Sequence, residues 1–293
     1  MNELLMNELL LTDGLTPRAV NGMTDEIFDD TTDADDKTDA DATDEQSATE
    51  STIGPTEPVL VADGVSKAFG DVEVLRDLSL SVASGSATAI IGPNGAGKST
   101  LLRTLAGVIP PTEGHVSYRG PEARREIGYL PQQPAFRSGF TARETLAFYT
   151  AFVGGEPDAL LDSVGLEAAG DRRVEALSGG MRRLLGIAQA TVGDPPVIVL
   201  DEPSSGLDPG MGRRMFEVVA DLAAGGTAVL YSSHDLAQVE RVADRVVVVD
   251  RGRVVDDGPP ERLCRRHDAE SLQDLFDALV ADRSGSVAVS GVS

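Results

Sequence analysis

The feature that most constrains this chain is the glycine-rich stretch GPNGAGKST at residues 92–100, which follows a short apolar run at 87–91. A loop of this kind between a strand and a helix lets successive backbone N–H groups point at a phosphate. We therefore predict that it binds a nucleoside triphosphate, with Lys98 reaching the β- and γ-phosphate oxygens and Ser99 ligating Mg²⁺. The predicted phosphate-binding residues are Gly92, Pro93, Asn94, Gly95, Ala96, Gly97, Lys98, Ser99 and Thr100.

An acidic pair, Asp201-Glu202, ends the β-branched run at 197–200. Because the carboxyl ends of parallel strands meet at one edge of a sheet, this pair is expected to lie beside the phosphate loop. Asp201 is predicted to hold Mg²⁺, largely through water. Glu202 is predicted to orient and polarise the attacking water as a general base.

Shorter signals fall in a fixed order around these two motifs. Leu177-Ser178-Gly179-Gly180-Met181 opens a helical stretch about twenty residues before the acidic pair. A glutamine follows the strand-like run at 127–130, and an aspartate and a histidine follow the acidic pair at 208 and 234. With this order of motifs, the chain resembles the nucleotide-binding subunit of an ATP-binding-cassette (ABC) transporter over about residues 58–260.

The resemblance implies a role for each of these residues. Gln132 would sense Mg²⁺ and the γ-phosphate, and His234 would contact the γ-phosphate, so that Glu202, His234 and Gln132 form the catalytic set. Ser99, Gln132 and Asp201 would be the metal ligands. Phe69 would stack on adenine. The implied cofactors are ATP and Mg²⁺.

The resemblance also implies a second copy. Ser178 and the amides of Gly179 and Gly180 would bind the γ-phosphate of ATP held by another subunit, at a helix N-terminus. Asp208 would line the seam between the two subunits. The expected partners are therefore a second ATPase subunit, in a homodimer, and an ABC permease in the membrane. This places the chain in the cytoplasm, peripheral on the inner face of the cell membrane.

One residue departs from the commonest pattern. Met181 stands where that pattern has Gln. In having Met at this position, the chain is similar to exporters of the ABC-2 type. An ATPase subunit that drives such an exporter is the leading hypothesis. An importer subunit for a metal or small solute is the alternative, and a soluble ABC ATPase acting on ribosomes or DNA is a third.

Alternating apolar runs and helical stretches from residue 59 onward predict an α/β fold. The expected architecture is a P-loop NTPase core of the ABC-ATPase type. It has a mostly parallel sheet, an antiparallel β flank that includes 72–82 and 252–257, and an inserted helical subdomain. The predicted domains are an acidic disordered tail at 1–57, the ATPase domain at 58–265 with its helical subdomain at about 141–192, and a C-terminal helix with a frayed tail at 266–293.

The formal net charge of −23 argues against nucleic acid as a partner, since the chain offers little to neutralise phosphates. Residues 1–57 hold 16 of the 48 acidic side chains and only 2 of the 25 basic ones. With just three lysines, the composition is similar to that of proteins from salt-accumulating halophiles. The single cysteine, Cys264, lies among arginines and is expected to be an incidental surface thiol.

Overall fold

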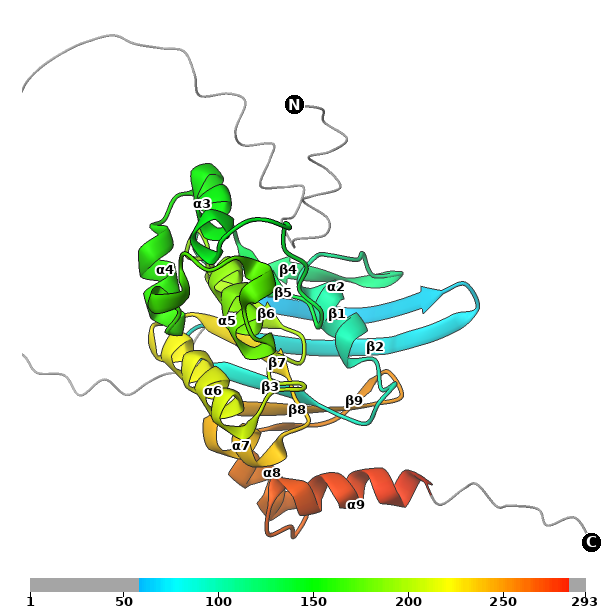
Figure 1. Cartoon of the computed structure of the whole chain (residues 1–293). Coiled ribbons are helices and arrows are strands. Elements are labelled where there is room, and N and C mark those ends of the chain that lie inside the picture. Colours follow the sequence, from blue (N-terminus) through cyan, green and yellow to red (C-terminus); the bar gives the residue numbers. More distant parts are fainter. Residues whose placement is uncertain (1–57, 285–293) are drawn as a thin grey trace, which may run out of the picture.

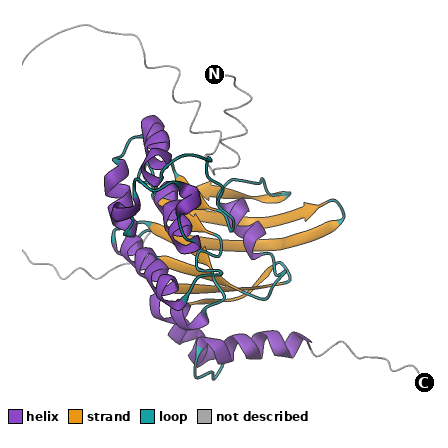
Figure 2. Ribbon diagram, in the orientation of Figure 1, coloured by secondary structure: helices purple, strands orange, loops and turns teal. Residues whose placement is uncertain are grey.

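The structure is a computed structural model that describes residues 58–284. The predicted acidic tail at 1–57 and residues 285–293 of the predicted frayed end lie outside the described residues. Within the described part, two β-sheets lie together, and most of the helices gather on one side of them (Figure 1; Figure 2). Among these helices none is long and apolar enough to cross a membrane.

The larger sheet has six strands in the order β5-β6-β7-β3-β8-β9. Its first five strands pair in parallel, and only β9 runs antiparallel to its neighbour β8. Strand β6 is buried along its whole length, as expected of a parallel strand covered on both faces. The six strands are β3 (Ala87–Ile91), β5 (Ile127–Leu130), β6 (Val197–Leu200), β7 (Ala228–Ser232), β8 (Arg245–Asp250) and β9 (Arg253–Gly258).

The smaller sheet is antiparallel, in the order β2-β1-β4. Its strands are β1 (Pro58–Phe69), β2 (Val72–Ala83) and β4 (Glu113–Tyr118). The predicted antiparallel segments at 72–82 and 252–257 are confirmed as β2 and β9. Strand β4 was not predicted, because its side chains are only partly buried or exposed and its sequence EGHVSY lacks a regular apolar alternation.

The helices follow from local signals at their starts. Helix α3 begins with a capping box, in which Thr141 Oγ1 accepts the N–H of Glu144 and the Glu144 carboxylate accepts the N–H of Thr141. Helices α3, α4 and α5 pack together between β5 and β6 in the sequence. The helices are α2 (Lys98–Leu105), α3 (Ala142–Val153), α4 (Pro157–Val164), α5 (Gly179–Ala190), α6 (Pro209–Ala224), α7 (Leu236–Val242), α8 (Pro260–Arg266) and α9 (Leu272–Ser284).

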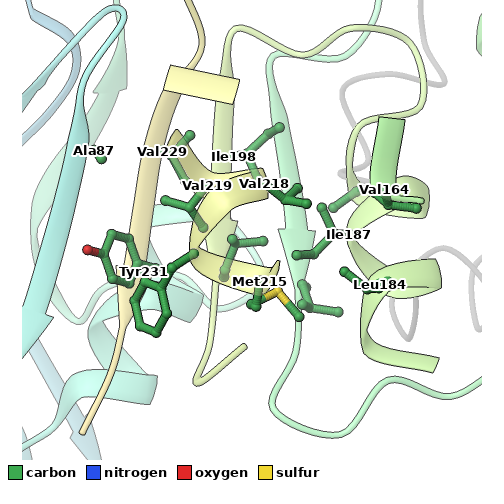
Figure 3. Close-up of a cluster of buried hydrophobic side chains, with 14 of the residues drawn as sticks. Ala87, Val164, Leu184, Ile187, Ile198, Met215, Val218, Val219, Val229 and Tyr231 are labelled. Carbon is green, nitrogen blue, oxygen red and sulfur yellow. The ribbon is translucent and has the colours of Figure 1, made fainter. Parts of the chain in front are cut away.

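Buried apolar side chains form two clusters. One lies where the helices cover the larger sheet. Figure 3 shows Met215, Val218 and Val219 of α6 turned toward Val229 and Tyr231 of β7. The other fills the space between the two sheets and around α2. Helix α2, which follows the phosphate loop, is thus fixed by a continuous core.

The C-terminal region differs from expectation in two ways. Helix α8 precedes the predicted terminal helix and was not anticipated. The expectation that Cys264 is a surface thiol is wrong, because Cys264 faces the interior from α8 and is only 7 % exposed. Burial, aided by the Glu240 carboxylate, raises the pKa of its thiol rather than lowering it.

Candidate functional site

The phosphate loop joins β3 to α2 as the sequence predicts, and Lys98 is folded back onto it. Lys98 is 6 % exposed, and its Nζ donates to the carbonyl oxygens of Gly92 at 2.8 Å and Pro93 at 3.2 Å. Burial lowers the pKa of Lys98, whereas the carboxylates of Glu202 and Asp201 act against this shift. The lysine therefore lies inside the loop, where its ammonium group holds two carbonyls in place.

Two glycines of the loop are required by contacts with the rest of the fold. A Cβ on Gly92 would lie 2.0 Å from the carbonyl oxygen of Val249 in β8. Gly97 has φ +103°, which other residues rarely adopt, and a Cβ there would lie 3.1 Å from the Val74 carbonyl oxygen. The loop thus packs tightly between β8 and β2, which fixes the direction of its backbone N–H groups.

Asp201 follows β6 and lies beside the start of α2. Its Oδ1 accepts hydrogen bonds from Ser99 Oγ and from Ser232 Oγ, both at 3.0 Å. Asp201 is 2 % exposed, and burial raises its pKa although these two hydroxyls stabilise the charged form. The structure therefore brings together Ser99 and Asp201, two of the three side chains predicted to ligate Mg²⁺. The third, Gln132, is bonded to the neighbouring Glu202 instead.

Glu202 links the remaining predicted catalytic residues. Its Oε2 accepts from Gln132 Nε2 at 2.9 Å, and its Oε1 lies 3.0 Å from His234 Nε2. Its backbone is in the left-handed region, with φ +47°, a conformation that is uncommon for residues other than glycine and is enriched at functional sites. Gln132, which follows β5, and His234, which follows β7, thus meet at the carboxylate of Glu202, which follows β6.

Sequence reasoning missed two residues of this site. Ser232, at the end of β7, donates to Asp201 and accepts the backbone N–H of Glu202 at 2.8 Å, so it connects both carboxylates. Arg183 of α5 has its Nη1 3.5 Å from the Pro131 carbonyl oxygen. Burial lowers the pKa of Arg183, and the charges of Glu202 and Asp201 oppose the shift. The signal for Ser232 was its position, since it ends a strand next to the acidic pair in the sheet.

The predicted second-subunit residues lie apart from this cluster. In the described part of the chain, the hydrogen bonds of Ser178 and Asp208 stay within their own helix starts. Ser178 Oγ accepts the N–H of Met181 at the start of α5, and Asp208 Oδ1 accepts two N–H groups at the start of α6. Gly179 is exposed, with open space where a Cβ would stand.

Phe69 is also separate, at the turn between β1 and β2. It is 51 % exposed, and Lys67 Nζ lies 5.2 Å from the centre of its ring. A large exposed aromatic ring with a cation on it is open to stacking by a flat ligand.

The donor set of the cluster fits Mg²⁺. This ion prefers oxygen ligands, retains several waters and is commonly bound through one or two carboxylates plus substrate phosphates. Ser99 and Asp201 supply such oxygens beside the loop. Within residues 58–284 no group of three or more His, Cys, Asp or Glu side chains forms a self-contained metal site.

Comparison with known proteins agrees with this geometry. Residues 75–205 match the family described as ABC transporter. The chain is 36 % identical to the Nod factor export ATP-binding protein I of Mesorhizobium japonicum over 249 residues, covering 78 % of this chain and 73 % of that protein. It is 38 % identical to the protein of that name from Bradyrhizobium diazoefficiens over 218 residues, covering 70 % and 71 %.

Solved structures give the same result. The ATP-binding subunit of an ABC transporter superposes with a TM-score of 0.68 at 30 % identity, covering 76 % of this chain and 99 % of that one. An ABC transporter cassette in its ADP conformation superposes with a TM-score of 0.63 at 27 % identity, covering 78 % and 97 %.

Proposed function

Because this chain belongs to the family of ABC transporter ATP-binding proteins, we propose that it hydrolyses ATP to drive a permease in the membrane. The observation that supports this proposal most directly is the convergence on Glu202. Gln132 and His234 both contact its carboxylate, while the neighbouring Asp201 is bonded to Ser99 of the phosphate loop. These contacts support the proposal that Glu202 is the general base, that Gln132 and His234 orient it, and that Ser99 and Asp201 hold the metal beside it.

The chemistry follows from these positions. Lys98 would exchange its bonds to the Gly92 and Pro93 carbonyls for bonds to phosphate oxygens. Ser99 and Asp201 would hold Mg²⁺, which when bound neutralises charge on the β- and γ-phosphate oxygens. Glu202 would accept a proton from water as the water oxygen bonds to the γ-phosphorus and the bond to the bridging oxygen breaks. Gln132 and His234 keep the Glu202 carboxylate in position until substrate binds.

The assembly is part of the proposal. Ser178 caps α5 with its hydroxyl, and Gly179 beside it is exposed. A helix N-terminus with open N–H groups suits an anionic ligand. We propose that it binds the γ-phosphate of ATP held by a second copy of this chain, with Phe69 stacking on adenine and Asp208 near the seam. ATP would then favour the closed dimer, and hydrolysis would release it.

Export is the proposed direction of transport. The relatives at 36–38 % identity are named as export ATP-binding proteins, and Met181 matches the pattern that suggested an exporter. We propose a location at the inner face of the membrane, held there by the permease. Purification of the tagged full chain from native membranes should recover a subunit with several membrane spans. Recovery together with a solute-binding protein would instead support an importer.

Replacement of the proposed base is the direct test of hydrolysis. Glu202→Gln should lower kcat about 10²–10⁴-fold, the usual contribution of a general base, because the amide cannot take up the proton. Binding of ATP should persist, since Lys98 and the loop are unchanged. Steady-state phosphate release and equilibrium binding of a fluorescent ATP analogue measure the two effects.

The matched control for this test is Glu217→Gln. Glu217 is an exposed carboxylate on α6 that pairs with Arg214 and lies outside the cluster. This control should retain wild-type turnover. Hydrolysis by the Glu202→Gln variant at a rate near that of the wild type would contradict the assignment of the base.

A further inference from the structure

Gly180, the second residue of α5, lies directly against a side chain of α6. A Cβ on Gly180 would be 2.3 Å from Met211 Cγ and 3.2 Å from both Sδ and Cε of the same residue. Atoms do not approach as closely as 2.3 Å without displacement. Met211 Cγ is near the backbone, so it can move aside only by rotation about the first side-chain torsion or by a shift of the helix.

The backbone of Met211 is itself held. Its N–H donates to Asp208 Oδ1 at 3.0 Å, and the N–H of Gly210 donates to the same oxygen at 3.0 Å. Asp208 is therefore the N-cap of α6 within its own chain. One continuous set of contacts runs from the Asp208 carboxylate through Met211 to Gly180.

The start of α5 is fixed by the same kind of cap. Ser178 Oγ accepts the N–H of Met181 at 3.1 Å. The Ser178 hydroxyl therefore satisfies the N–H of the third helical residue, Met181. It does not bind the N–H groups of Gly179 and Gly180, which belong to the same first turn. The tilt of that turn, and hence the direction of these two N–H groups, depends on what packs behind Gly180, which is Met211.

Behind Met211 the packing is incomplete. A cavity of about 400 Å³ lies between α4, α5 and α6, and Met211 forms part of its wall together with Met181, Leu184 and Leu166. Shortening Met211 would enlarge a cavity that already exists and is open to solvent. Such a change costs less stability than a new sealed void in the core.

We propose that Met211 is a positioning residue for the Ser178–Gly180 turn, and that it couples the cap of α6 at Asp208 to the direction of the Gly179 and Gly180 N–H groups. On this view residue 180 is glycine because Met211 occupies the space that its Cβ would need. The inference rests on the proposed function, in which this turn binds the γ-phosphate in the second copy.

A double-mutant cycle on the full chain tests it. Gly180→Ala should lower kcat about 10–100-fold, because the new methyl group displaces either Met211 or the turn. Met211→Ala should lower kcat less, about 3–10-fold. The double variant should recover to the level of Met211→Ala alone, because the clash has been removed. An effect of Gly180→Ala that is equally large with and without Met211 would overturn the proposal.

Gly179 supplies the matched control. No atom lies within 4 Å of the position of a Cβ at Gly179. Whatever effect Gly179→Ala has on kcat should therefore be the same in the wild-type and Met211→Ala backgrounds. Rescue of Gly179→Ala by Met211→Ala would show general loosening, and would overturn a specific role for Met211.

A second readout separates positioning from loss of fold. In a Glu202→Gln background, Met211→Ala should weaken ATP-dependent dimer formation, measured by sedimentation, while ATP affinity of the single chain stays unchanged. Met211→Leu retains a γ-carbon and should restore dimer formation. If Gly180→Ala fails to fold, the two Met211 variants still test the proposal. Normal dimerisation of Met211→Ala would overturn it. Absence of ATP hydrolysis by the wild type would instead count against the proposed function.

Discussion

Asp201 shows at the scale of one residue how the site balances burial against charge. Its carboxylate is almost wholly removed from solvent, with hydroxyl donors from Ser99 and Ser232 as its bonded partners. Two neutral donors do not replace the hydration of a carboxylate completely. The remaining need for positive charge is what a divalent cation would meet, so the raised pKa of Asp201 and its proposed role have one cause.

A pH-dependent stability effect follows from this balance. A carboxyl group whose pKa is raised by folding favours the folded state below its unfolded pKa, and this contribution is lost as the pH rises through the folded pKa. Asp201→Asn removes the buried charge. At neutral pH and without nucleotide, the variant should unfold at a higher temperature than the wild type. The difference should shrink as the pH falls through the raised folded pKa of Asp201, and it should be gone below about pH 4, the pKa of an unfolded aspartate.

Thermal unfolding at pH 7.5 and at the lowest pH that preserves the fold checks this prediction. Added Mg²⁺ and ATP should reverse the order at neutral pH, because the wild type gains the bound cation and the variant does not. Lower stability of Asp201→Asn at pH 7.5 without nucleotide would show that the hydroxyl donors already outweigh the cost of burial.

At the scale of elements, α5 is the helix on which the proposed function most depends, and both of its ends are tied. Ser178 caps its start. Its end is contacted by Arg125, a residue that comes just before β5 in the sequence. Arg125 is 6 % exposed, and its Nη1 donates to the Gln189 carbonyl oxygen at 3.1 Å. A cation at a helix C-terminus also interacts favourably with the helix dipole. The turn that Met211 positions is therefore the capped start of a helix whose other end is bonded to Arg125.

Removing that anchor should destabilise the fold. Arg125→Met keeps the aliphatic stem and deletes the charged donor to the carbonyl oxygens of Gln189 and Val192. We expect a loss of about 1.5–3 kcal/mol in the free energy of unfolding, the range for a hydrogen bond to a charged group. Urea unfolding measures the loss.

Arg124 is the matched control, since it is the neighbouring residue and is exposed. Arg124→Met should change the free energy of unfolding by less than about 0.5 kcal/mol, as is usual for surface substitutions. Equal effects of the two variants would show that Arg125 does not anchor the helix.

The elements also show where sequence patterns are informative. Strands β6 and β7 were predicted, because a strand that is buried on both faces has a nearly continuous run of apolar residues. Strand β4 was missed because it is a partly exposed edge strand of the small sheet, and its sequence has no continuous apolar run. Helix α8 was missed because its seven residues, PERLCRR, are too few to show a helical period.

For the whole molecule, net charge is the dominant property. The chain carries −23, and salt that screens repulsion between carboxylates should stabilise the compact state. We expect the urea midpoint of unfolding and the ATPase rate both to rise between 0.1 M and 2 M KCl. The Debye length falls over that range from about 10 Å to below about 3 Å.

Sucrose at matched osmolality serves as the control, because it stabilises by exclusion from the surface and does not screen charge. The predicted adaptation to salt would be contradicted by a midpoint and a rate that are as high in dilute buffer as in 2 M KCl.

The sequence by itself determined the fold class and most of the site. Asp201, Glu202 and His234 follow the ends of apolar runs, and Lys98 follows the glycine-rich loop after another such run. Parallel strands bring such ends to one edge of the sheet. That inference needs only local pattern and chain order. It correctly predicted which side chains meet, because these residues lie next to recognisable strands.

Only the tertiary structure decided the contacts made across the fold. Gly92 is glycine because of Val249, Gly180 because of Met211, and Ser232 joins both acidic residues. Cys264 is buried although arginines surround it in the sequence. Each of these contacts depends on which strand or helix lies alongside another, often many residues away in the sequence. Such packing between distant elements produces no periodic pattern in the local sequence.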